Sequence, residues 1–291
     1  MILNYYDTVK SAPAIFKQIC CKELLFANYT CPLETNKQDK WSHCNYILYI
    51  LTGKEVIHTP DRSLILTKGK AVFVKKGAYI MEKFFDEILC LVVFFIPDNY
   101  LCSFVRENSG LVQKNQSMPD FDDVVISLEV NEILTGYYES ILPYFDSETK
   151  PPEDLLELKF RELLFNIIGN PANGELNTYL QTLISPQSDN LQRIIEANCH
   201  YNLRLEDYAK MCNRSLSSFK RDFSKIYGTA PANWLLNKRL QYAMQLLMSS
   251  DRTINDISFE SGFENNAHFS RAFKKQYGLS PLKYRLQTQS A

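Results

Sequence analysis

Two stretches near the end of the 291-residue chain place arginine and lysine at matching positions. They are SLSSFKRDFSKIYGTAP (215–231) and NAHFSRAFKKQYGLSP (266–281). Arg221 aligns with Arg271, so the offset between the copies is 271 − 221 = 50 residues. Arginine can donate two hydrogen bonds to a guanine edge, and lysine and serine can donate to phosphates. The paired stretches therefore predict contact with nucleic acid.

On a helical wheel of about 100° per residue, each stretch separates an apolar side, built around two phenylalanines, from a polar side. The polar side has small residues near the N-terminus of the helix, Arg in the middle and Lys toward the end. This arrangement suits a DNA major groove. A single helix of this kind is better interpreted as a solvated surface, but two matched helices favour DNA contact. The candidate contact residues are Ser217, Lys220, Arg221, Ser224 and Lys225 in the first helix and Ser270, Arg271, Lys274 and Lys275 in the second.

Turn and cap residues predict the elements that would hold these faces. Asn213 in the first copy and Gly262 in the second stand at an expected tight turn, and these residue types tolerate positive φ best. Thr253 with Asp256 resembles a capping box that opens the second copy. Each copy is therefore predicted to be a helix, a turn and a second helix. The expected N-caps of the second helices are Ser215 and Asn265, and the expected stop residues are Gly228 and Gly278, followed by Pro231 and Pro281.

The segment between the copies, PANWLLNKRLQYAMQLLMSS (231–250), has apolar residues at helical spacing. About 18 helical residues form a rod of ~27 Å, near the ~34 Å that separates successive major-groove faces on one side of B-DNA. One copy of the chain could thus read two adjacent major-groove segments without dimerising.

Charge is divided unevenly along the chain. Residues 190–291 hold 15 Lys and Arg against 8 Asp and Glu, a net of 15 − 8 = +7. The remaining residues hold 17 against 25, a net of 17 − 25 = −8, which leaves −1 for the whole chain. A basic final third beside an acidic remainder indicates a polyanion-binding module attached to another domain.

From about Asp189 to Tyr284, the chain resembles the DNA-binding domain of the AraC/XylS family of bacterial transcription regulators. The segment DISFESGFENNAHFSRAFKKQYGLSPLKYR (256–285) is similar to that family's signature nearly end to end. The resemblance implies an all-α domain with two helix-turn-helix units joined by a long helix. Asp222 stands where an apolar residue is expected, and we expect it to pair with Lys238 or Arg239. The base-facing positions that the resemblance implies are Ser217, Lys220, Arg221, Asn266, His268, Ser270 and Arg271.

The first 100 or so residues are rich in short β-branched and aromatic runs separated by turn signals, which predicts a small barrel or sandwich. The family resemblance implies a cupin-like β-barrel with flanking helices, and hence a multidomain α+β protein. We expect residues 1–185 to be a sensory or dimerisation domain and residues 189–291 to be the double helix-turn-helix domain. Residues 109–127 are polar and predict a loop. The expected strands include 45–51, 63–67, 71–76, 78–84 and 90–96, and the expected helices are 96–108, 129–145 and 153–169.

Enzyme chemistry has little support in the sequence. Metal-dependent cupins share an H-x-H motif, whereas His43 and His58 stand alone, and no nucleophile motif or phosphate-binding glycine loop is present. We therefore expect no catalytic residues, no metal site and no cofactor. A cupin-type small-molecule-binding protein or enzyme is the remote competing class.

The sequence also predicts where the protein works. The most apolar run, Glu87 to Pro97, is too short to cross a membrane, and the N-terminus has no signal-peptide pattern. The eight cysteines show no zinc-ligand spacing. We expect a cytoplasmic, nucleoid-associated bacterial protein with reduced thiols.

The signal that controls the protein has two interpretations. Residues 46–83 resemble the N-terminal domain of the type III secretion activators of the family, which are controlled by a binding protein. The alternative is a small-molecule effector. The helices at 129–145 and 153–169 predict either a homodimer contact or packing onto the barrel. The family implies RNA polymerase as a partner and activation as the outcome, with repression as the alternative. The residues that could line an effector pocket are Tyr46, Tyr49, Phe73, Tyr79 and Phe84.

Overall fold

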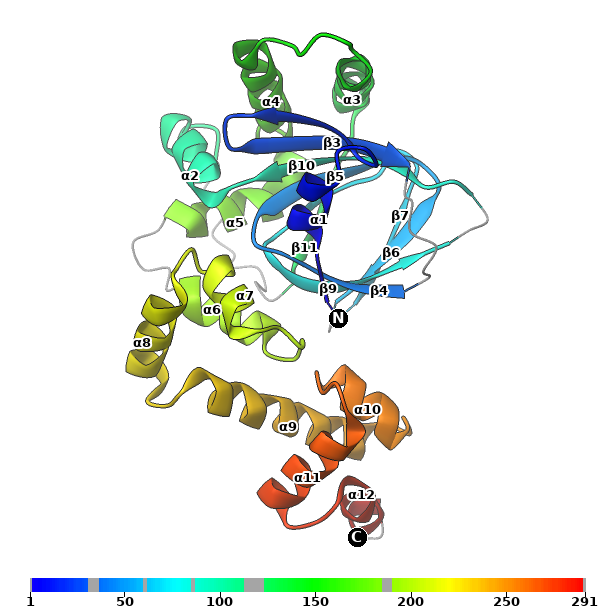
Figure 1. Ribbon diagram of the computed structural model, residues 1–291. Coiled ribbons are helices and arrows are strands. Elements are labelled where there is room, and N and C mark those ends of the chain that lie inside the picture. Colours follow the sequence, from blue (N-terminus) through cyan, green and yellow to red (C-terminus); the bar gives the residue numbers. More distant parts are fainter. Residues whose placement is uncertain are drawn as a thin grey trace. The chain divides into compact units, whose positions relative to one another are not determined.

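The computed structural model describes residues 2–30, 37–59, 62–84, 87–112, 123–184 and 190–289. The chain divides into two compact units, Met1–Ser188 and Asp189–Ala291. The first unit carries the described strands and five α-helices, and the described part of the second is helical (Figure 1).

The strands of the N-terminal unit form two sheets. The first has the order β11-β8-β5-β10-β3-β2, and the second has the order β1-β4-β9-β6-β7. Neighbouring strands are antiparallel, except for the parallel pair β1 and β4. The strands are β1 (Leu3–Asn4), β2 (Lys17–Cys21), β3 (Leu24–Thr30), β4 (Lys37–Ser42), β5 (Asn45–Thr52), β6 (Lys54–His58), β7 (Ser63–Thr67), β8 (Ala71–Val74), β9 (Gly77–Lys83), β10 (Cys90–Ile96) and β11 (Val125–Leu128).

The six-stranded sheet has a hydrophobic core on each face. Along β10, Leu91, Val93 and Phe95 face the core that includes residues of the five-stranded sheet. Val92 and Phe94 alternate with them and face a second core, which includes residues of α2 to α5. Burial on both faces explains why β10 is apolar along its length. The helices of this unit are α1 (Tyr5–Ser11), α2 (Asp98–Glu107), α3 (Glu132–Phe145), α4 (Glu153–Ile168), the 3-10 turn η1 (Pro171–Asn173) and α5 (Gly174–Ile184).

Two expectations for this unit need correction. The strands do not close into one barrel, because the described ladders end at β11 and β2 in one sheet and at β1 and β7 in the other. The expected loop at 109–127 ends in a strand, since Val125 and Ile126 are buried and β11 pairs with β8. The rest of that loop includes residues 113–122, which lie outside the described residues.

The aromatic residues proposed to line one effector pocket belong to different parts of the unit. Tyr46 and Tyr79 pack between the sheets, where their hydroxyls share a hydrogen bond. Tyr49 lies on the opposite face of β5 and stacks on Tyr138 of α3, with ring centroids 3.9 Å apart. Phe73 also faces the helices, and its ring lies 5.6 Å from that of Tyr179 in α5. The fifth residue, Phe84, lies under the Lys54 ammonium.

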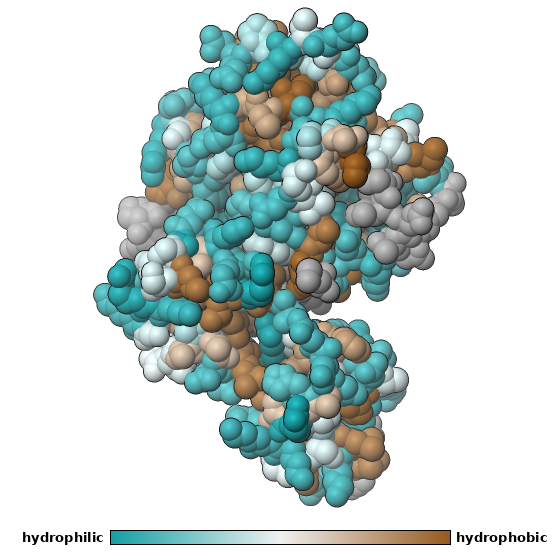
Figure 2. All heavy atoms as spheres, in the orientation of Figure 1, coloured by the Kyte–Doolittle hydropathy of each residue, from teal (hydrophilic) through white to brown (hydrophobic). Residues whose placement is uncertain are grey.

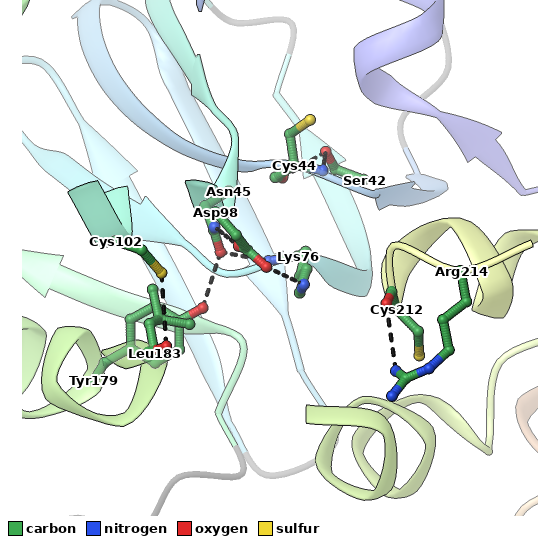
Figure 3. Close-up of polar contacts among 10 residues, drawn as sticks. All are labelled: Ser42, Cys44, Asn45, Lys76, Asp98, Cys102, Tyr179, Leu183, Cys212 and Arg214. Carbon is green, nitrogen blue, oxygen red and sulfur yellow. Dashed lines mark hydrogen bonds and ion pairs between the residues drawn. The ribbon is translucent and has the colours of Figure 1, made fainter. Parts of the chain in front are cut away.

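A buried polar network joins the six-stranded sheet to α2 and α5 (Figure 3). Asn45 Nδ2 donates to Asp98 Oδ1 at 2.6 Å, and the Tyr179 hydroxyl donates to Asn45 Oδ1 at 3.0 Å. Lys76 forms an ion pair with Asp98, and only 2% of the Lys76 side chain is exposed. The Cys102 thiol donates to a carbonyl near the end of α5. These contacts hold α5, the last described helix of the unit, on the sheet.

The C-terminal unit is arranged around its longest helix, α9. Tyr208 of α7 stacks on Phe219 of α8, and Trp234 of α9 contacts Phe223 of α8 edge to face. On the other side of the unit, α9 packs with α10 and α11 around the buried Phe273. The helices are α6 (Asn190–Asn198), α7 (Leu205–Met211), α8 (Leu216–Tyr227), α9 (Pro231–Ser249), α10 (Ile254–Glu260), α11 (Asn266–Tyr277) and α12 (Pro281–Gln289).

The described residues contain neither a membrane-spanning helix nor a cluster of metal-binding side chains. Within the ranges given above, no helix has both the length and the apolar character needed to cross a membrane. In the same ranges, no cluster of three or more His, Cys, Asp or Glu side chains has an arrangement that could hold a metal ion.

Candidate nucleic-acid interface

The first candidate reading helix, α8, has the expected ends. The preceding turn places Asn213 at φ 53°, in the left-handed region that asparagine tolerates. Ser215 is the N-cap, and its hydroxyl accepts a hydrogen bond from the Ser218 amide at 3.3 Å. Gly228 ends the helix at φ 66°. Pro231 is then the first residue of α9, where its missing N–H costs nothing.

The second candidate reading helix, α11, repeats this arrangement. Gly262 has a φ of 76° in the preceding turn, and Gly278 ends the helix at a φ of 79°. Asn265 is the N-cap, because its side-chain oxygen accepts from the His268 amide at 2.9 Å. Thr253 caps α10 in the same way. The two units of the sequence repeat are thus also repeats in backbone conformation.

Both helices bury their phenylalanines and expose most of their polar residues. Phe219 and Phe223 of α8, like Phe269 and Phe273 of α11, are fully buried. The sequence-predicted residues that are exposed are Ser217, Lys220, Arg221, Ser224 and Lys225 on α8, and His268, Arg271, Lys274 and Lys275 on α11.

The other two predicted residues are half-buried. They are Asn266 and Ser270 of α11. Asn266 Nδ2 lies 3.5 Å from Asn255 Oδ1 of α10, and Asn266 Oδ1 is buried. The sequence predicts this residue only through the family resemblance, and the wheel does not include it among the exposed candidates. Asn266 therefore differs from the exposed cationic residues and is the weaker candidate for a base contact.

The arginine at the middle of each helix already has a partner on its own helix. Arg221 Nη2 donates to the Ser218 hydroxyl at 3.2 Å. Arg271 Nε donates to the Ala267 carbonyl at 3.2 Å. Both partners lie one turn toward the N-terminus, the direction in which helical side chains lean. That end of a recognition helix contacts base edges in helix-turn-helix proteins.

The predicted pairing of Asp222 with the linker helix is wrong. Arg214 Nε donates to Asp222 Oδ2 at 3.1 Å, and Arg221 Nε lies 3.3 Å from Asp222 Oδ1. Loss of hydration raises the pKa of Asp222, but hydrogen bonds from Arg214 and Arg221 outweigh it and hold the pKa below its ordinary value. Arg214 also donates to the carbonyl of Cys212 in the turn (Figure 3). Asp222 is therefore tied to the turn and to its own helix.

The two linker residues make other contacts. The ammonium of Lys238 lies over the Trp234 ring, 5.2 Å from its centroid. Arg239 donates to three backbone carbonyls from two distant parts of the unit. No spacing in the sequence signals these acceptors, because a carbonyl belongs to every residue type.

Comparisons with known proteins cover most of both units. Residues 45–179 match the family described as the ExsA N-terminal regulatory domain, and residues 208–287 match a helix-turn-helix domain family. The transcriptional regulator ExsA of Pseudomonas aeruginosa is 26% identical over 241 residues, which is 82% of this chain and 85% of ExsA. The chain belongs to the AraC/XylS family of bacterial transcription regulators.

Other members of the AraC/XylS family show similar coverage. The virulence regulon transcriptional activator VirF of Yersinia enterocolitica is 24% identical over 82% of this chain and 88% of its own. Among solved structures, an apo ToxT variant from Vibrio cholerae aligns with 91% of this chain and 97% of its own, with 15% identity and a TM-score of 0.43. Together with the two family matches, the curated relatives identify this protein as a helix-turn-helix DNA-binding transcription regulator with an N-terminal regulatory domain.

Proposed function

We propose that this AraC/XylS-family chain binds promoter DNA by placing α8 and α11 in two successive major-groove segments. The observation that carries the proposal is the matched pair of exposed cationic faces on two helices that each have a side-chain N-cap and a left-handed glycine at the C-terminal end. The 19 residues of α9 between them form a rod of about 28 Å, close to one turn of B-DNA. In this arrangement Arg221 and Arg271 contact guanine edges.

The remaining residues of each face have supporting roles. Lysines toward the end of each helix neutralise phosphates, and the serines near the start leave room for the helix to enter the groove. His268 and Asn266 are further base contacts implied by family resemblance. The assigned DNA-contact residues are Ser217, Lys220, Arg221, Ser224, Lys225, Asn266, His268, Ser270, Arg271, Lys274 and Lys275.

Salt dependence tests this assignment. The full chain is titrated onto a duplex that it has selected from a random pool, at several salt concentrations. Each phosphate contact makes the slope of log affinity against log salt more negative by about 0.9. Several contacts therefore give a steep slope. Lys225→Gln and Lys275→Gln should each make the slope shallower by about 1, whereas Lys283→Gln, an exposed site on α12, should leave it unchanged. A flat salt response of the wild-type chain contradicts groove binding.

The cupin-like N-terminal unit, in this proposal, controls an activator that recruits RNA polymerase in the bacterial cytoplasm. A regulatory protein suits the unit better than a small molecule, because the aromatic residues that could line one pocket are divided between two cores. A metabolite screen read by melting temperature, run beside co-purification, separates the two inputs. A stabilising metabolite would favour the small-molecule effector.

The helices α3 and α4 are the proposed homodimer contact. Their inner residues, such as Tyr138 and Phe160, pack on the six-stranded sheet, so the packing interpretation holds for that face. On their outer surface Ile133 and Leu158 are 63% and 64% exposed. Hydrophobic side chains reach the surface among hydrophilic ones in this region (Figure 2). Replacing both residues by Lys should lower the fraction of dimer in sedimentation, and an unchanged fraction contradicts this contact.

A further inference from the structure

The C-terminal unit has a first half, α6 to α8, and a second half, α10 to α12, with α9 between them. Arg239, in the middle of α9, contacts both halves. Its Nε donates to the Cys199 carbonyl at 3.2 Å and its Nη2 to the Tyr201 carbonyl at 2.6 Å, both in the loop between α6 and α7. Its Nη1 donates to the Gly262 carbonyl at 3.3 Å, in the turn between α10 and α11. One guanidinium therefore binds the first half and the second half at once.

The two halves also touch each other directly at this place. A Cβ atom at Gly262 would lie 2.6 Å from the His200 carbonyl oxygen and 3.3 Å from the Tyr201 carbonyl carbon, so the loop packs against the turn with no space between. Asn202 Nδ2 donates to Glu264 Oε1 at 2.9 Å across the same contact. The His200 ring lies on Tyr242 of α9, with centroids 4.3 Å apart. The contact is therefore a joint with three sides: loop, turn and linker helix.

The loop and the turn each continue into a reading helix. On the first side, the Tyr208 hydroxyl donates to the Asn198 carbonyl beside the loop, and the Tyr208 ring stacks on Phe219 of α8. On the second side, Phe263 follows the turn and contacts Phe269 of α11, with ring centroids 5.1 Å apart. Rotation of either reading helix against the other would disturb these buried contacts.

We propose that Arg239 is a positioning residue that fixes the distance and rotation between α8 and α11, and so sets the half-site spacing that the protein accepts. The inference rests on the proposed function, in which both helices read one DNA site. A planar guanidinium can satisfy three carbonyls in fixed directions, whereas a lysine ammonium or an apolar side chain cannot reproduce that geometry. Without Arg239, the loop still packs on the turn and Asn202 still donates to Glu264, but the three hydrogen bonds that tie both to α9 are lost.

The spacing between the two half-sites on DNA can be changed in small, known steps, and this tests the proposal. Inserting one base pair between two half-sites moves one of them by about 3.4 Å and rotates it by roughly 34–36°. A rigid protein cannot follow such a change and loses the contacts of one half. A protein with a loosened joint follows it more easily, but binds the original spacing less tightly because it must order the joint on binding.

The test uses the full chain and a duplex that the wild-type chain has selected, with zero, one or two base pairs inserted or removed between the half-sites. Wild-type affinity should fall about tenfold or more on a one-base-pair change, the loss expected when one good base contact is given up. Arg239→Met should bind the original duplex more weakly and lose less than about threefold on the same change. Lys238→Met is the matched control, because it removes a neighbouring charge of α9 outside the joint, and it should keep the wild-type spacing profile.

Two outcomes overturn the proposal. Arg239→Met with an affinity loss that is equal at every spacing shows that Arg239 does not set the spacing. A wild-type chain that tolerates mutation of one complete half-site overturns the two-helix function as well, and so the two failures are distinguishable. If Arg239→Met does not fold, the Asn202→Ala and Glu264→Gln double variant takes its place with the same criteria, because these residues of the same joint are half-buried and exposed, respectively.

Discussion

Arg221 Nε lies 3.3 Å from Asp222 Oδ1, so a candidate guanine-reading arginine is held by an acidic neighbour on its own helix. The two side chains are 76% and 32% exposed, and exposed ion pairs of this kind are weak, which lets DNA take the arginine. Arg271 of the second helix has no such acidic neighbour on α11, where Ala272 follows it. The two halves therefore differ in charge at the equivalent position.

Asp222→Ala should raise affinity for specific and random DNA alike, because it removes a negative charge beside the phosphates. The ratio of the two affinities should fall, since Arg221 loses a group that orients it.

The pKa of Asp222 is held below its ordinary value, so its stabilising pairs persist at neutral pH and disappear only as pH falls through that lowered pKa in acid. The effect of the substitution should thus be the same at about pH 6 and about pH 8. Asp251→Ala is the control for the loss of one negative charge. If Asp222→Ala leaves the affinity for random DNA unchanged, this role of Asp222 is contradicted.

Arg221→Ala and Arg271→Ala should each lower specific binding by about 1–3 kcal/mol and relax selectivity only within the half-site of the altered helix. The reason is that a bidentate arginine discriminates guanine from other bases, whereas a phosphate contact does not. Repeated site selection with each variant measures the effect. A uniform loss on all sequences would assign both arginines to phosphates instead.

Gly262 and Gly278, in the second copy of the sequence repeat, should respond differently to alanine. Both have positive φ, 76° at Gly262 and 79° at Gly278, so either substitution costs about 1–2 kcal/mol in backbone strain. Gly278 has open space around its added Cβ, whereas the Cβ at Gly262 would meet the His200 carbonyl oxygen at 2.6 Å. Gly262→Ala should therefore cost roughly 1–3 kcal/mol more. Denaturant unfolding followed by circular dichroism gives the comparison, and equal losses would contradict the close packing of the joint.

Local signals predicted the repeat in detail. Ser215 and Asn265 cap their helices because a short polar side chain can reach the free amides of the first turn. Asn213 and Gly262 occupy left-handed turns because other residue types are strained there. These effects depend on a few consecutive residues, so the sequence alone contains them.

Contacts between distant segments could not be predicted in this way. Arg239 binds the carbonyls of Cys199 and Tyr201, about 40 positions earlier in the chain, and only the folded unit brings them together. The sequence pattern does not predict that Asp222 pairs with Arg214, because a helical wheel gives a direction but not the position of Arg214 in the turn. The division of the strands into two sheets depends on which strands pair at the sheet edges. The alternation of apolar and polar residues along a single strand does not reveal that pairing.

The cysteines should react with alkylating reagents according to burial. Burial raises the pKa of the Cys44 thiol to about 12 and that of Cys199 to about 11, so their thiolate fractions at pH 8 are about 10⁻⁴ and 10⁻³. Cys20 is exposed. In the native protein, a short iodoacetamide pulse read by mass spectrometry should label Cys20 before Cys44 and Cys199. Labelling of Cys44 or Cys199 at the same rate would show that these sites open to solvent.

The most direct measurement of two-helix binding is guanine methylation interference on a duplex selected by the full chain. Methylation at N7 blocks the major-groove edge that arginine reads. If α8 and α11 both read the duplex, interference appears in two clusters about one helical turn, or roughly 10 base pairs, apart on one face of the DNA. Arg221→Ala should remove interference in one cluster and Arg271→Ala in the other. A single cluster, or none, would contradict the claim that α8 and α11 read DNA together.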